Sequence, residues 1–149
     1  MGFQPVGRGS TLAGLGLLAI RLGVGASMLI FHGYGKISGG PDTWEKIGGN
    51  MGHFGIQLFP VFWGLMAALA ESLGSTLLMI GFLFRPAAAV LAFTMLVAIV
   101  RHVSLPADAP GAGFAGASHA IELFSVYVGL LLLGPGKYGL RWVRRSRED

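Results

Sequence analysis

The chain has 149 residues, of which 53% are hydrophobic and only 12% charged, about half the charged fraction of a soluble domain, which excludes an ordinary soluble fold and predicts a protein embedded in lipid. The absence of cysteine excludes disulfides, thiolate metal sites and thiol redox chemistry within the chain. The net charge of +4 does not indicate nucleic-acid binding, because five of the eleven basic residues lie in the last thirteen positions, after the last apolar run.

Four apolar stretches follow in chain order, each near the length of about 20 residues that a helix needs to cross a bilayer. They run over residues 12–31, 58–83, 86–103 and 117–134. The last is the shortest apolar run, and it approaches spanning length only when residues 117–119 extend it. We therefore expect one all-α domain over residues 1–149, an antiparallel bundle of four transmembrane helices.

The connections between the spans differ in length. Only Phe84, Arg85 and Pro86 separate the second span from the third, which predicts a tight antiparallel hairpin with Pro86 opening the third helix. The connection over residues 33–57 is long and glycine-rich, and residues 42–54 have the spacing of a short amphipathic helix that lies on the membrane surface. The last connection contains two prolines and three glycines and is expected to be irregular.

Basic residues are distributed unequally between the two sides of the predicted bundle. Seven lie on the side of the termini and three on the other side: Arg8, Arg85, Lys137, Arg141, Arg144, Arg145 and Arg147 against Lys36, Lys46 and Arg101. Cytoplasmic loops of membrane proteins carry the excess of Lys and Arg. Both termini, and with them the basic tail of residues 138–149, are therefore predicted to be cytoplasmic.

Two ionisable residues are predicted near the middle of the bilayer. Arg21 lies nine residues into the first span, and Glu71 lies about midway along the second. A charge inside a span is costly and needs a partner or a wet cavity, so we expect these two side chains to pair directly or through water. Such a pair either holds two helices in register or handles protons or substrate. Arg21 and His32 are eleven residues apart, which predicts one shared helix face.

A second polar layer is predicted near the outer face. His32 closes the first span, His102 lies near the outer end of the third, and His119 and Glu122 lie one turn apart at the start of the fourth. Histidines in such places most often bond a carboxylate or a backbone carbonyl. Proton transfer, hydrogen bonding to a quinone or similar ligand, and ligation of a metal or haem, the least favoured, remain open alternatives.

Several short motifs, taken together and in order, resemble those of the DoxX family of small bacterial and archaeal membrane proteins. The resemblance covers residues 20–140. The matching stretches are Arg21–Gly25 leading to Phe31–Lys36, Ala70–Gly74 followed by Leu77–Phe82, then Ala98–His102, His119–Leu123 and Gly134–Tyr138.

The resemblance implies a four-helix bundle in a bacterial-type cytoplasmic (inner) membrane. It carries over six polar positions: Arg21, His32, Lys36, Glu71, His102 and Glu122. Lys36 thus joins His32, His102, His119 and Glu122 in an expected outer-face polar pocket. Members of the family have been linked, as a small membrane subunit, to a thiosulfate:quinone oxidoreductase, and to membrane-associated oxidoreductase complexes in oxidative-stress defence.

The leading interpretation is a small subunit or partner of a quinone-linked membrane redox system, an oxidoreductase subunit without activity of its own and with no catalytic residue identified. A quinone is favoured over haem or metal as its cofactor. Its expected partners are the bilayer, other subunits of a redox complex or a second copy. One alternative is a non-catalytic assembly or anchoring subunit, which predicts a solid bundle. The other is a small-molecule or lipid transporter, which predicts a cavity at the midplane, whereas a ligand role predicts a cavity that reaches His102 and Glu122.

Overall fold

The structure is a computed structural model that describes residues 11–140. Within these residues the chain forms helices and no strand. Four helices are long and apolar enough to cross a membrane: Thr11–Ser38, Pro60–Ile80, Phe84–Ser104 and Gly113–Leu133. The prediction of an all-α protein with four spans is confirmed. Arg8 and most of the predicted basic tail lie outside the described residues.

Two of the spans are interrupted by π-helical segments, in which the backbone hydrogen bonds skip one residue more than in an α-helix. The first span comprises α1 (Thr11–Met28), the π-helix η1 (Leu29–Gly33) and α2 (Tyr34–Ser38), and the second comprises α4 (Pro60–Leu69), the π-helix η3 (Ala70–Gly74) and α5 (Ser75–Ile80). Between them lie α3 (Gly40–Gly48) and the 3-10 helix η2 (Gly49–Phe54). The last two spans are the single helices α6 (Phe84–Ser104) and α7 (Gly113–Leu133).

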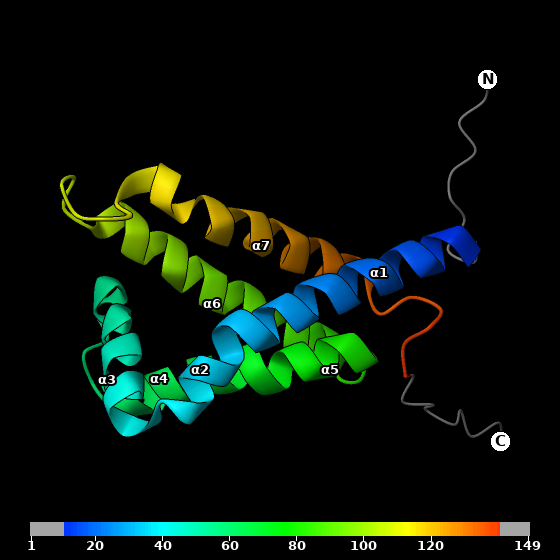
Figure 1. Ribbon diagram of the computed structural model, residues 1–149, viewed down its shortest axis with the longest axis horizontal. Helices are drawn as coiled ribbons and strands as arrows, with labels where there is room; N and C mark the ends of the chain where they lie inside the picture. The colour runs from blue at the N-terminus through cyan, green and yellow to red at the C-terminus, as the bar shows by residue number, and fades with distance from the viewer. Residues whose placement is uncertain (1–10, 141–149) are drawn as a thin grey trace, which may run out of the picture.

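Figure 1 shows α6 and α7 side by side as an antiparallel pair, with α1 running across the bundle. The described chain begins and ends at the same end of the bundle, which we call the terminal end. At the opposite end, which we call the loop end, lie α3 and the connection between α6 and α7. The second span, α6 and α7 therefore each have one terminus at each end.

The first span extends seven residues beyond the predicted end at Phe31, because the helix continues through the glycine-rich segment to Ser38. Gly33 makes this continuation fit. A Cβ atom at Gly33 would lie 2.5 Å from the carbonyl oxygen of Glu71, so only glycine lets the first and second spans touch backbone to backbone here. The longer helix brings Lys36 onto the bundle instead of into a loop.

The connection between the second and third spans is a short turn, as expected, but it consists of residues 81–83 and not of residues 84–86, which belong to the third span. Gly81 ends α5 in the left-handed conformation, with φ of 77°, and α6 begins at Phe84. Pro86 lies in the first turn of α6, where its missing N–H is not needed. The fourth span begins at Gly113, four residues before the predicted start, and its 21 residues are enough to cross a bilayer.

The predicted surface helix over residues 42–54 consists of α3 followed by η2, and it packs closely on α4. Two glycines allow this approach. A Cβ atom at Gly48 would lie 1.7 Å from the Pro60 carbonyl oxygen, and one at Gly64 would lie 1.8 Å from the Trp44 carbonyl oxygen. Helices α3 and α4 are therefore locked together through backbone contacts at the loop end.

The bundle buries little of its own apolar surface. Its core includes Met28, Leu78, Leu91 and Tyr127, from four different helices. In each span, however, at most 33% of the most apolar window is buried inside the protein. Side chains such as Phe31, 77% exposed, require lipid around them, because exposing so much apolar surface to water is strongly unfavourable. The protein is an integral membrane protein that spans the bilayer several times.

Candidate functional site

The two π-helical segments lie against each other near the middle of the bundle. The close approach of Gly33 to the Glu71 carbonyl joins their backbones. Each segment carries an ionisable side chain next to this contact: His32 in η1 and Glu71 in η3. π-turns insert one residue into a helix and often occur at functional sites. This junction is therefore a candidate functional site.

Glu71 pairs with Lys36, one turn after His32 on the extended first span. The Lys36 ammonium donates to the Glu71 carboxylate, with 2.6 Å between Nζ and Oε1. The Glu71 side chain is only 3% exposed, whereas that of Lys36 is 30% exposed. The second carboxylate oxygen, Oε2, is buried and has no hydrogen-bond partner among residues 11–140. The structure thus places one ion pair with spare hydrogen-bonding capacity deep in the protein.

Neighbouring side chains hold this pair in place. The indole N–H of Trp44 donates to the carbonyl oxygen of Lys36, at 2.8 Å, and so ties α3 to α2. The ring of His32 stacks on that of His119 from α7, with centroids 5.8 Å apart. His32 lies one turn before Lys36 on the first span. A line of ionisable groups therefore runs from Glu71 through His32 to His119, whose residue is exposed.

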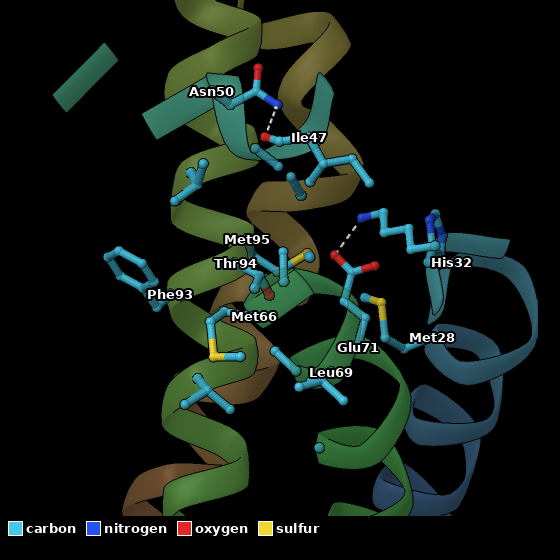
Figure 2. A pocket seen from close by; sticks show the side chains of 18 of the residues that line it. Met28, His32, Ile47, Asn50, Met66, Leu69, Glu71, Phe93, Thr94 and Met95 are labelled. Carbon is cyan, nitrogen blue, oxygen red and sulfur yellow. Dashed lines mark hydrogen bonds and ion pairs between the residues drawn. The ribbon is translucent and has the colours of Figure 1, made fainter. Parts of the chain in front are cut away.

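A cavity of about 970 Å³ adjoins these groups. It lies between the second span and α6, with α1, α3, η2 and α7 adding to its wall. Figure 2 shows Met28, His32 and Glu71 on one side of it and Thr94 and Met95 of α6 on the other. The wall also carries further polar side chains: Lys36, Lys46, Asn50, Trp63, Arg101, His102 and His119. The bundle is therefore not solid.

The cavity wall carries more positive than negative side chains. Three cations line it, Lys36, Lys46 and Arg101, and Glu71 is the one carboxylate among the described lining residues. The rest of the wall is mainly apolar, with several methionines and Phe93. An apolar cavity with a few convergent donors suits a ligand with an apolar body and an electron-rich, hydrogen-bond-accepting head.

The cavity opens sideways toward the lipid. Helix α4 packs on α3, α6 packs on α7, and α4 makes almost no contact with α6. On the two sides of the resulting gap, Met66 of α4 and Phe93 of α6 both line the cavity and are 37% and 46% exposed. Since these residues lie well within their spans, the surface that they share faces the hydrocarbon region. Exposed apolar side chains from the second span and α6 therefore border the cavity at mid-span.

The predicted pair of Arg21 with Glu71 does not form. Arg21 is 2% exposed and donates through Nη1 to the carbonyl oxygen of Pro135, at 2.7 Å, and through Nη2 to that of Tyr138. The reason is the length of the first span. Gly33 is the residue beside Glu71, so Arg21 lies twelve residues, or roughly 18 Å along the helix, toward the terminal end. There it fastens the segment after α7 to the bundle.

The predicted outer-face group is brought together in part. His32, Lys36, His102 and His119 line the cavity, whereas Glu122 does not and is exposed. The ring nitrogen Nδ1 of His102 lies 2.6 Å from the carbonyl oxygen of Gly111, which is the backbone contact expected of a histidine at a helix end. Helix α7 turns His119 toward His32, and Glu122 projects elsewhere.

Three polar residues of the cavity wall were not predicted from the sequence. Lys46, Asn50 and Arg101 were not among the candidates, although Arg101 directly precedes His102. The available signal was that Arg101 is a charge at the end of a span. Among residues 11–140 no three His, Asp or Glu side chains lie close enough together to hold a metal ion.

Comparisons with known proteins agree with the motifs. The family model described as DoxX matches residues 16–103, which is more than half of the chain and includes Arg21, His32, Lys36 and Glu71. No curated protein and no solved structure gave a significant match. The matched region ends within α6, so α7 and its His119 lie beyond it.

Proposed function

This chain belongs to the DoxX family of membrane proteins, and we propose that it is a small subunit or partner of a membrane redox system that binds a quinone in the cavity beside Glu71. The observation that supports this function is the combination of a lipid-facing opening with the Lys36–Glu71 pair at its inner end. We place the protein in a bacterial-type cytoplasmic membrane with both termini cytoplasmic, as the excess of basic residues on the terminal side favours.

The residues present fit a quinone. Its apolar tail suits the wall formed by Leu73 and Phe93, and its carbonyl oxygens need donors, which Lys36 and the imidazole of His32 supply. When bound, a quinone supplies two-electron chemistry, in which it takes up two electrons and two protons to become a quinol. The electrons would come from a partner oxidoreductase, since this chain offers no thiol.

The role of this chain is to bind and orient the quinone and to exchange protons with it. Lys36 donates a hydrogen bond to a carbonyl oxygen in the cavity while it keeps the Glu71 carboxylate charged. Glu71 Oε2, buried and without a partner in the described part of the chain, is the atom that can take or give a proton. His32 and His119 extend from Glu71 to the exposed side of α7. Because histidine changes charge near neutral pH, these rings suit proton exchange with water at the loop end.

The two alternatives make different use of the same features. A lipid transporter would also profit from a lateral opening at mid-span, but it would favour acyl chains over a redox headgroup. An anchoring subunit needs no cavity of about 970 Å³. The proposal therefore depends on whether the cavity recognises the headgroup.

Quenching of tryptophan fluorescence by decylubiquinone, with the protein in lipid nanodiscs, tests this recognition. Trp63 lines the cavity, so a bound quinone should quench it saturably, and Trp63→Phe should remove most of that signal. Decanol, which has a tail and no quinone head, is the ligand control and should not compete. Glu71→Gln should weaken binding about tenfold, because the Lys36 ammonium that donates to the quinone carbonyl loses the carboxylate that positions it.

Glu122→Gln is the matched control, because Glu122 also lies in a span but does not line the cavity. It should bind the quinone as the native protein does. Quenching that rises linearly with quinone and is equal in all variants would reflect simple partitioning into lipid, and it would refute the proposal. Competition by phospholipid or decanol as strong as that by quinone would instead support the transporter.

A further inference from the structure

Three buried polar atoms in the middle of the protein have no hydrogen-bond partner among residues 11–140: Oε2 of Glu71, Oγ of Ser75 and Oη of Tyr127. Glu71 is 2% exposed, and Ser75 and Tyr127 are fully buried. Nearly all buried polar atoms in native proteins have a partner, because leaving one unsatisfied costs free energy. Three such atoms, from the second and fourth spans, call for a common explanation.

The depth of these residues can be read from the helix register. Gly74, next to Ser75, faces Leu91 of α6, since a Cβ atom at Gly74 would lie 3.8 Å from Cγ of Leu91. Leu91 is thirteen residues from Ser104, where α6 ends, and Tyr127 is fourteen residues from Gly113, where α7 begins. Both distances correspond to about 20 Å from the loop end. Ser75 and Tyr127 therefore lie at nearly the same depth.

The direction of the side chains brings both hydroxyl groups toward Glu71. Side chains in helices lean toward the N-terminus of their own helix. The second span and α7 both start at the loop end, so Ser75 and Tyr127 lean toward the loop end, where Glu71 lies one turn before Ser75. From their shared depth and this direction, we expect the three atoms to lie together on the inner side of the Lys36–Glu71 pair.

We propose that Glu71 Oε2, Ser75 Oγ and Tyr127 Oη together bind one buried water molecule. Buried waters in proteins typically make two to four hydrogen bonds to groups that otherwise lack partners. A phenol and an alcohol can each donate or accept, and a carboxylate oxygen accepts, so the three atoms suit a water that donates to Glu71. The water gives Glu71 a second partner besides Lys36.

This site makes Ser75 and Tyr127 positioning residues for Glu71. With the water in place, Glu71 can lose or gain a proton without leaving a buried oxygen unsatisfied, because the hydroxyl groups reorient. That role in proton exchange depends on the proposed function of the cavity, whereas the existence of the water site does not.

Removing each hydroxyl group tests the site through the sign of the stability change. Tyr127→Phe and Ser75→Ala should each lower the thermal midpoint of the detergent-solubilised protein by about 3 °C or more, since each removes a hydrogen bond from the water. If the hydroxyl groups are unsatisfied in a dry core, their removal should leave the midpoint unchanged or raise it. Tyr34→Phe and Ser125→Ala remove exposed hydroxyl groups and serve as matched controls with no effect.

Infrared spectroscopy measures the hydrogen bonding of Glu71 directly, and this signal would not change if Tyr127 had only a structural role. The carboxylate stretching band of Glu71, identified by its loss in Glu71→Gln, should shift in Tyr127→Phe because the carboxylate loses a hydrogen-bonded neighbour. An unshifted band would overturn the proposal even if the midpoint falls. Failure here would leave saturable quinone quenching and its loss in Glu71→Gln intact, so the two proposals can fail separately.

Discussion

Replacing Lys36 with methionine should destabilise the protein chiefly by leaving the Glu71 carboxylate buried and unpaired. Breaking a buried ion pair from one side typically costs 3 to 5 kcal/mol. Two features limit the cost here. The Lys36 side chain is 30% exposed, which places the pair at the lower end of that range. Glu71 can also escape by taking up a proton, which costs a carboxylate about 4 kcal/mol in water at pH 7. We therefore expect a loss of about 3 kcal/mol for Lys36→Met at pH 7.

A double-mutant cycle separates this pair from the pair that the sequence suggested. The variant with both Lys36→Met and Glu71→Leu should recover much of the loss, with a coupling energy of about 2 kcal/mol. The corresponding cycle of Arg21→Met with Glu71→Leu should show additive effects. Arg21 lies roughly 18 Å along the first span from Gly33, which is the residue beside Glu71. Reversible unfolding in mixed detergent and SDS micelles measures both. A Lys36–Glu71 coupling near zero, or a strong Arg21–Glu71 coupling, would refute the assignment.

The remaining predictions concern packing and topology. Gly64→Ala should lower the thermal midpoint severely or prevent folding, because its Cβ would lie 1.8 Å from the Trp44 carbonyl oxygen; Gly23→Ala, which meets nothing within 4 Å, should be neutral or slightly stabilising, and equal effects of the two would argue against the α3–α4 contact. A reporter active only in the cytoplasm should work when fused after Asp149 and be silent when inserted at Gly49, and the reverse pattern would contradict the proposed orientation.

Much of the fold could be predicted because apolar runs of spanning length have few alternatives in a chain this hydrophobic. The ends of the spans were less predictable. The first span was expected to stop at Phe31, since glycines usually mark turns, yet Gly33 lies inside the helix. It is needed there because Glu71 of the second span touches it, and no local pattern in the sequence reveals that contact.

The candidate site could be predicted by residue type but not by pairing. Burial of Arg21 and Glu71 follows from their places within apolar runs. Their partners do not, because Arg21 bonds to the backbone carbonyls of Pro135 and Tyr138, which any residue could supply. Lys36 was expected at the outer face, and only the extension of the first span brings it to Glu71.

The π-turn in the first span explains why the partner of Glu71 is Lys36. Buried positions in α1 are Gly14, Arg21, Gly25 and Met28, spaced by seven, four and three residues as in an α-helix, but the next buried residue, Gly33, follows after five. A straight helix would continue this face to His32, as the eleven-residue spacing from Arg21 suggested. The inserted residue instead turns Gly33 onto the face and leaves His32 beside it, pointing to His119. Three residues further along the same face lies Lys36, so a single extra residue in η1 positions both the glycine that admits the backbone of Glu71 and the ammonium group that pairs with its side chain.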